Sequence, residues 1–191
     1  MSLSALSYAS PSLSPAPTAT GPRRPEPLEP DLLHDIAAGI ATATTLWEPL
    51  VAHDPAERRP VRLLATERYE VWVIGWMPGQ RADLHDHGDA AGAVLVVDGT
   101  LTEHTVTAEG VRTTSLPAGT ARDLAVGLVH EVRNDHDGPA TSIHVYSPPL
   151  ETMTRYDGES LAPTVTELVR AEAPAIVASA DSVLHHPSVR G

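Results

Sequence analysis

Two histidines separated by one residue, His85 and His87, are the strongest indication of chemistry in this sequence. Side chains two positions apart on a strand point to the same face. Two imidazoles on one face of an extended segment can therefore bind a single metal ion. A third histidine, His130, lies in a later segment from Gly119 to Asn134 and is the candidate third ligand. The sequence thus predicts a metal centre with three imidazole ligands.

The ligand types alone leave the metal open. Imidazole nitrogen suits Fe, Zn, Cu and Ni. Three protein ligands leave open coordination positions, which are typical of catalytic sites, whereas structural zinc sites are closed. With no carboxylate ligand, a divalent ion would keep its charge and would favour an anionic thiolate, whereas zinc held by three histidines would activate water.

The glycines around the histidine pair resemble the first motif of the cupin superfamily. That motif reads Gly, five residues, His-x-His, three or four residues, Glu, six residues, Gly. The matching residues are Gly79, His85, His87 and Gly99. The second cupin motif reads Gly, five residues, Pro-x-Gly, two residues, His, three residues, Asn. It is matched by Gly119, Gly127, His130 and Asn134, with Ala125 where proline is usual.

The missing glutamate narrows this resemblance. The motif would place a glutamate at Ala91 or Gly92, and no carboxylate is there. Three histidines without it are similar to the cysteine dioxygenase (thiol dioxygenase) family of cupins. That family carries Ser-x-His-x-Tyr-Ser-Pro-Pro further on, as SIHVYSPP does here from Ser142 to Pro149. The likeness covers roughly residues 58–157. It is to bacterial members, because Gly92 stands where animal members carry a cysteine linked to a tyrosine.

The resemblance implies a reaction and a cofactor. The cofactor would be non-haem Fe(II), on which a small-molecule thiol substrate and O2 meet, and both oxygen atoms would go onto sulfur to give a sulfinic acid. L-cysteine, giving cysteine sulfinic acid, is the first expected substrate. A dioxygenase for 3-mercaptopropionate or another thiol carboxylate is the alternative. A zinc-dependent cupin enzyme and a non-catalytic ligand-binding cupin are more distant alternatives.

Three residues on one predicted strand are the catalytic candidates beyond the metal ligands: Ser142, His144 and Tyr146. They lie two apart, so all three can face the cavity together. The resemblance implies that the histidine orients the tyrosine and that the serine supports the histidine. Tyr146 would then form a hydrogen bond near the bound oxygen or the substrate carboxylate.

The substrate carboxylate calls for an arginine, because the planar guanidinium forms two parallel bonds with a carboxylate. The resemblance favours Arg62 as the main residue that binds the substrate carboxylate, with Arg58 and Arg59 as fallbacks. In related 3-mercaptopropionate dioxygenases an arginine after the tyrosine takes this role, and Arg155 is its candidate here. Met153 lies where the family lines the pocket.

The elements that must position these residues are mostly short strands. Between residues 61 and 146, runs of β-forming residues alternate with Gly and Pro turns, which predicts an all-β sandwich or barrel. The cupin resemblance selects the double-stranded β-helix, a jelly-roll barrel with the metal inside. Helices are predicted before it, from Asp31 as N-cap and from Thr44 to Val51, and a short C-terminal helix from Thr164 to Glu172. We expect a disordered Ser/Ala/Pro-rich tail at residues 1–30, the domain at 31–173 and a tail at 174–191.

Composition limits the partners. The 191-residue chain has a formal net charge of −12, which argues against nucleic acid and anionic membranes. It has no cysteine, which excludes disulfides and thiolate ligands. Neither a secretory signal nor an apolar run of about 20 residues is present. We therefore expect a cytoplasmic protein that is a monomer or a weak homo-oligomer.

Overall fold

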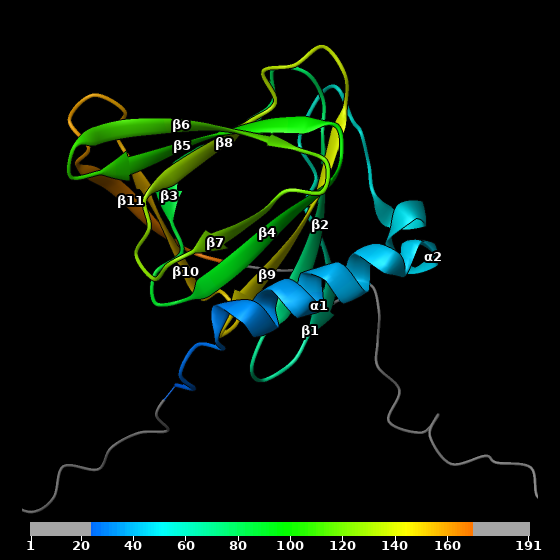
Figure 1. The fold of residues 1–191 in the computed structure, drawn as a ribbon. Helices are drawn as coiled ribbons and strands as arrows, with labels where there is room; N and C mark the ends of the chain where they lie inside the picture. The colour runs from blue at the N-terminus through cyan, green and yellow to red at the C-terminus, as the bar shows by residue number, and fades with distance from the viewer. Residues whose placement is uncertain (1–23, 170–191) are drawn as a thin grey trace, which may run out of the picture.

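Two antiparallel β-sheets face each other in the computed structural model of this chain and enclose a barrel (Figure 1). The structure describes residues 24–169. The first sheet has the strand order β1-β2-β9-β4-β7. Its strands are β1 Val61–Ala65, β2 Glu70–Trp76, β4 Ala91–Asp98, β7 Ala121–Leu124 and β9 Ala140–Ser147.

The second sheet has the strand order β11-β10-β3-β8-β5-β6. Its strands are β3 Arg81–Asp86, β5 Thr100–Thr107, β6 Gly110–Pro117, β8 His130–Arg133, β10 Thr152–Tyr156 and β11 Pro163–Leu168. The chain passes repeatedly from one sheet to the other, so that each sheet contains strands from early and late parts of the sequence. This arrangement confirms the predicted all-β cupin barrel.

One helix covers the outside of the first sheet. Helix α1, Pro30–Thr42, lies across β4 and β9 (Figure 1), and α2, Thr44–Trp47, and the 3-10 turn η1, Glu48–Leu50, follow it. The two predicted N-terminal helices are thus confirmed. The predicted N-cap is wrong, because the helix already begins at Pro30 and Glu29 holds the N-cap position without a side-chain bond. Proline is favoured at the first helical position, since its missing N–H needs no partner there.

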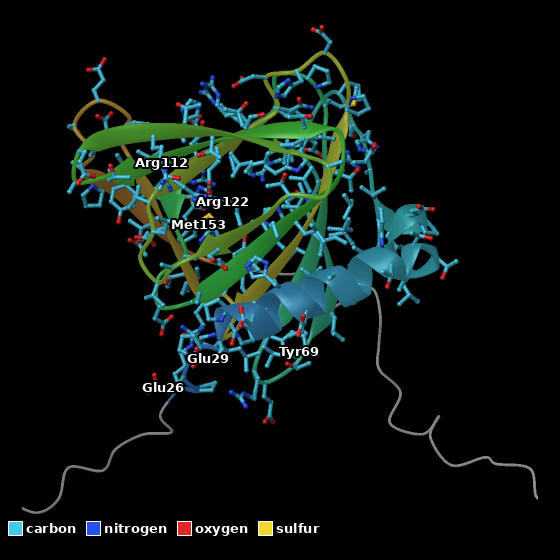
Figure 2. All side chains as sticks on the ribbon, in the orientation of Figure 1. Glu26, Glu29, Tyr69, Arg112, Arg122 and Met153 are labelled. Carbon is cyan, nitrogen blue, oxygen red and sulfur yellow. The ribbon has the colours of Figure 1, made fainter. Side chains whose placement is uncertain are left out.

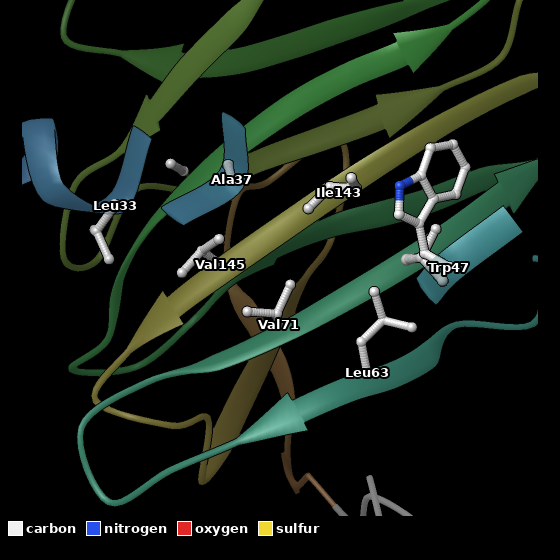
Figure 3. Close-up of a cluster of buried hydrophobic side chains, with 9 residues drawn as sticks. Leu33, Ala37, Trp47, Leu63, Val71, Ile143 and Val145 are labelled. Carbon is white, nitrogen blue, oxygen red and sulfur yellow. The ribbon is translucent and has the colours of Figure 1, made fainter. Parts of the chain in front are cut away.

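The core beneath α1 is aliphatic with one tryptophan (Figure 3). Figure 3 shows Leu33 and Ala37 of the helix facing Ile143 and Val145 of β9. The other members of this cluster are Trp47, Leu63, Val71, Val73 and Ala93. Burying a Val, Leu or Ile side chain stabilises the fold by roughly 1.5–3 kcal/mol. This outer core keeps β9 in place, and β9 carries the candidate Ser142–His144–Tyr146 row.

The segment before α1 also contacts the barrel. Arg24 forms ion pairs with Asp89 and Glu151, and the Leu28 amide donates to Ser147 Oγ at 3.0 Å. Residues 24–30 belong to the N-terminal tail predicted at residues 1–30. The rest of that tail, residues 1–23, and the tail at 174–191 lie outside the described residues. No helix within residues 24–169 is long and apolar enough to cross a membrane.

The predicted C-terminal helix is wrong over its described part. Residues 163–168 form strand β11, which pairs antiparallel with β10 from Thr152↔Leu168 onwards. The run Thr164, Val165, Thr166 is β-branched, which favours extended backbone, and β10 offers it a free edge. Leu168 on this strand is 69% exposed. The remainder of the predicted helix, residues 170–172, lies outside the described residues.

The turn between β4 and β5 gives a test of the barrel's packing. Gly99 has a φ of +72°, and a Cβ there would lie 2.4 Å from the Pro139 carbonyl oxygen. Left-handed backbone costs a non-glycine residue roughly 1–2 kcal/mol, and the collision adds to this cost. We therefore expect Gly99→Ala to lower the free energy of unfolding, measured by urea denaturation, by more than that amount.

Gly119→Ala is the matched control. Gly119 has a similar φ of +85°, but a Cβ there would meet nothing within 4 Å. The unfolding free energy of Gly119→Ala should fall only by the roughly 1–2 kcal/mol that left-handed backbone costs a non-glycine residue. Equal losses in the two variants would contradict the close approach of the β4–β5 turn to Pro139.

Candidate active site

Three buried histidines converge at one point between the sheets. His85 lies near the end of β3, His87 directly follows that strand, and His130 begins β8, where it pairs with His85 across the two strands. Their candidate ligand nitrogens all lie within 4.8 Å of one another. The three predicted ligands are therefore brought together. Within the described residues, Nε2 of His87 and Nε2 of His130 are buried without a hydrogen-bond partner, which fits a bound metal ion.

Two of the three imidazoles are oriented by an acceptor on the far side of the ring. His85 Nδ1 lies 2.6 Å from the Asp83 carbonyl oxygen, and His130 Nδ1 lies 2.9 Å from Glu103 Oε1. A ring that donates from Nδ1 leaves the lone pair on Nε2 free for a metal. Glu103 was not among the predicted site residues. The inward orientation of Glu103 could have been predicted, because Glu103 lies two residues after the buried Leu101 and so shares the inward face of β5.

Burial lowers the pKa of two of these ligands. Desolvation, with a smaller contribution from the neighbouring His130, lowers the pKa of His85 to about 3. The pKa of His87 lies well below its ordinary value, first because of burial and then because of His85. Burial alone would raise the pKa of Glu103, but hydrogen bonds from His130 and Arg122 outweigh it and lower that pKa. The cluster thus presents His85 and His87 as neutral imidazoles, with the ionised carboxylate of Glu103 behind His130.

A hydrogen-bonded row runs beside the histidines along β9. Ser142 Oγ lies 2.8 Å from His144 Nε2, and His144 Nδ1 lies 3.1 Å from the Tyr146 hydroxyl. Trp76 Nε1 donates to Ser142 Oγ at 2.8 Å, a partner that sequence analysis missed. The ring of Tyr146 is 4.7 Å from that of His87, centroid to centroid. The three predicted residues therefore form one connected row that ends next to the histidine cluster.

A cavity of about 170 Å³ opens onto this cluster. Its lining residues include His85, His130, His144, Tyr146, Trp72, Trp76, Leu150, Met153, Arg58 and Arg155. Figure 2 labels Met153 in the space between the two sheets. The structure therefore places the predicted Met153 and Arg155 at the cavity. Arg155 Nε also lies 3.3 Å from Glu167 on β11.

Arg62 is not among the residues that line the cavity, contrary to the prediction. Its guanidinium lies 3.3 Å from the carboxylate of Glu70, which is only 1% exposed. A buried carboxylate needs a charged partner, and β1 brings Arg62 next to β2, where Glu70 begins the strand. Arg58, which precedes β1, takes the place at the cavity, and its guanidinium carbon lies 4.8 Å from the centroid of the Trp76 ring.

Comparison with known proteins agrees with this geometry. The family model described as Cysteine dioxygenase type I matches residues 24–159, more than half of the chain.

The chain belongs to the cysteine dioxygenase type I family.

Cysteine dioxygenases type 1 from Rattus norvegicus and Mus musculus are each 27% identical to this chain over 101 residues. The match covers 47% of this chain and 50% of each relative, so the chain spans about half the length of the curated relatives it matches. A protein from Thermus thermophilus superposes with a TM-score of 0.49 and 22% identity, over 53% of this chain and 93% of that protein. A double-stranded β-helix protein from Klebsiella pneumoniae has a TM-score of 0.48 and 25% identity, over 53% and 85%.

Gly92 occupies the position at which animal members of the family carry a cysteine linked to a tyrosine. Gly92 on β4 pairs in register with Tyr146 on β9. A Cβ at this position would lie 2.9 Å from Tyr146 Cδ1 and 2.8 Å from the Val145 carbonyl oxygen. Gly92 therefore lies against the Tyr146 ring, and the ring occupies the space that a side chain at position 92 would need. Family membership and the histidine cluster together fit a cupin thiol dioxygenase with a metal cofactor.

His144 gives a test of the buried polar row through pH. Burial, with a smaller contribution from Arg58, lowers the pKa of His144 to about 3. An unfolded histidine titrates near pH 6.5, so between about pH 6.5 and 3 the unfolded chain binds a proton that the folded chain excludes. Stability is therefore full above pH 6.5 and falls as pH decreases. We expect His144 to contribute up to about 1.4 kcal/mol per pH unit to the slope of unfolding free energy in metal-free protein.

Replacing His144 separates its contribution to the pH slope from the contributions of the other titratable groups. His144→Gln should flatten the slope measured by urea denaturation between pH 7.5 and 5, and His136→Gln, at an exposed position, should leave it unchanged. An unaltered slope in His144→Gln would contradict a neutral, buried His144.

Proposed function

We propose that this protein is a non-haem Fe(II) thiol dioxygenase that oxidises L-cysteine with O2 to cysteine sulfinic acid. One observation supports this above all. Three buried histidines with no carboxylate among them converge beside the row that ends at Tyr146. His85, His87 and His130 would hold the metal. Ferrous iron held there would bring the substrate thiolate and O2 together.

The reaction balances without a further reductant. A thiol and one O2 give a sulfinic acid, RSH + O2 → RSO2H, in which sulfur supplies all four electrons that reduce the oxygen. Three neutral ligands leave the charge of a divalent ion uncompensated, which favours binding of an anionic thiolate. The protein therefore has to bind and orient the thiol, keep water out and supply hydrogen bonds to the reacting atoms.

Arg58 is the residue suited to bind the substrate carboxylate. Its half-buried guanidinium lies over Trp76 at the cavity wall and has no salt bridge within residues 24–169. Burial lowers the pKa of Arg58, yet a guanidinium remains protonated in proteins. A cation removed from water without an anionic partner favours binding of an anion. A carboxylate meets its planar fork with two parallel hydrogen bonds.

Tyr146 is suited to donate a hydrogen bond inside the cavity. Burial raises the pKa of its hydroxyl, so the group stays a neutral phenol. His144 holds that hydroxyl at 3.1 Å and is itself held by Ser142. The row therefore fixes the phenol beside the histidine cluster, where its proton can reach the substrate or oxygen.

Arg155 supports the alternative substrate. It lines the same cavity and could bind the carboxylate of 3-mercaptopropionate or of another thiol acid that lacks an amine. Its guanidinium is already paired with Glu167 at 3.3 Å, whereas Arg58 has no such partner within the described residues. This difference favours Arg58 and hence cysteine.

The carboxylate contact can be tested with a thiol panel on Fe(II)-loaded protein. Losing one partner of a buried, hydrogen-bonded charge pair costs roughly 2–5 kcal/mol, or about 30-fold or more in binding. We therefore expect Arg58→Gln to raise the KM for cysteine by at least about 30-fold in oxygen-uptake assays. The KM for cysteamine, which has no carboxylate, should change little.

Arg59→Gln is the control, because Arg59 is exposed and pairs with Asp54 and Glu57. It should behave as the wild type. A larger loss from Arg155→Gln, or faster turnover of 3-mercaptopropionate than of cysteine by the wild type, would move the substrate assignment to the alternative.

Tyr146→Phe tests the phenol. We expect roughly 10-fold or greater loss of kcat, the effect of one hydrogen bond to a charged group, with iron content unchanged by elemental analysis. The ring and its packing remain, so the variant removes only the hydroxyl. Wild-type oxygen uptake by this variant would rule out a role for the hydroxyl, and loss of iron would show a structural role instead.

A further inference from the structure

A buried ionic chain leads from the surface to the histidine cluster. Arg122 on β7 donates from Nε to Glu103 Oε2 at 2.8 Å, and His130 Nδ1 lies 2.9 Å from the other oxygen, Oε1. Glu103 and His130 are each 1% exposed. The side chain of Arg122 is 25% exposed, and Figure 2 shows it in the space between the two sheets. Both oxygens of a fully buried carboxylate are thus used, one of them on a histidine of the cluster.

The strand register makes this contact possible. On the paired strands β5 and β8, Thr105 lies opposite His130 and Glu103 lies opposite Val132. Glu103 is therefore the diagonal neighbour of His130 on the same inward face, within reach of a long side chain. Arg122 reaches Glu103 from the other sheet, since β7 belongs to the first sheet and β5 to the second. The carboxylate is held from both sides of the barrel.

The contact decides which nitrogen of His130 can bind a metal. A carboxylate oxygen only accepts, so Nδ1 must carry a proton, and Nε2 is the nitrogen left to bind a metal. Nε2 is also the nitrogen that is buried without a partner within the described residues. His85 has a backbone carbonyl in the equivalent place. Within residues 24–169, Glu103 is the one charged side chain hydrogen-bonded to any of the three histidines.

We propose that Glu103 is a positioning residue of the metal centre, which locks the Nδ1–H tautomer of His130 and makes Nε2 a stronger donor. Arg122 moderates this effect, because it shares the negative charge of Glu103 through the second oxygen. A site of three neutral ligands thus gains one partly neutralised negative charge behind a single ligand. The inference rests on the proposed metal site and extends it to residues that touch neither metal nor substrate.

The test uses the full chain, stripped of metal, with two graded variants. Glu103→Gln keeps the shape and an accepting oxygen but removes the charge, and Glu103→Leu removes the acceptor. Glu131→Gln is the control, since this neighbouring carboxylate on β8 pairs with Arg133 instead. Two quantities are measured: the Co(II) dissociation constant by competition titration, and the ¹⁵N chemical shifts of the His130 ring in metal-free protein.

Loss of a carboxylate behind a ligating histidine typically weakens metal binding by about 10- to 100-fold. We expect the Co(II) affinity of Glu103→Leu to weaken within this range and that of Glu103→Gln to weaken less. The Co(II) affinity of Glu131→Gln should match the wild type. The His130 shifts should report Nδ1–H in the wild type and in Glu103→Gln. They should move toward the other tautomer in Glu103→Leu. Arg122→Gln should change the Co(II) affinity while the Nδ1–H signature stays.

A merely structural role would lower the unfolding free energy and leave both quantities unchanged in the folded fraction. Unchanged Co(II) affinity in Glu103→Gln and Glu103→Leu, or a wild-type His130 protonated on Nε2, would overturn the proposal. Should Glu103→Leu fail to fold, the shifts of the wild type and the affinity of Glu103→Gln still decide it. Metal binding as expected with no thiol oxidation would overturn the proposed function alone.

Discussion

The structure depends on bringing three imidazoles side by side in a buried interior. A charge on any of them would be both desolvated and close to its neighbours, and burial pushes the pKa of His85 and His87 far down. The barrel makes this possible by enclosing the cluster between two sheets that are themselves held by an aliphatic core under α1. Three imidazole nitrogens brought together in this way have one evident chemical use, which is to bind a cation.

The other side chains of the site form hydrogen bonds that satisfy its buried polar groups. Ser142, His144 and Tyr146 on β9 and Trp76 on β2 satisfy one another's polar atoms, so the phenol is held at the cavity by protein groups. Glu103 and Arg122 satisfy His130 from behind. Arg58 is the exception, because this cation at the cavity wall has no salt bridge within residues 24–169. The proposed binding of a substrate carboxylate rests on this unpaired charge.

Local sequence patterns predicted the parts of the site whose geometry is local. His85 and His87 share a short segment, and Ser142, His144 and Tyr146 share one strand, so period-two spacing was sufficient. Arg62, predicted to bind the substrate carboxylate, does not line the cavity, because a buried carboxylate on β2 binds its guanidinium. Glu103 and Arg122 come from different sheets, and their contact depends on the closure of the barrel. The C-terminal segment was misread because its apolar spacing fits a helix, whereas its β-branched residues and the free edge of β10 favour a strand.

The most direct measurement of the central claim is the fate of oxygen in a single reaction. Protein loaded with Fe(II) is given L-cysteine under ¹⁸O₂, and the product is analysed by mass spectrometry. A dioxygenase built on these three histidines predicts cysteine sulfinic acid with both oxygens labelled. A sulfinic acid with label on one oxygen or none, or full turnover of some other substrate by the zinc-loaded protein with no sulfinic acid from the iron form, would contradict the account.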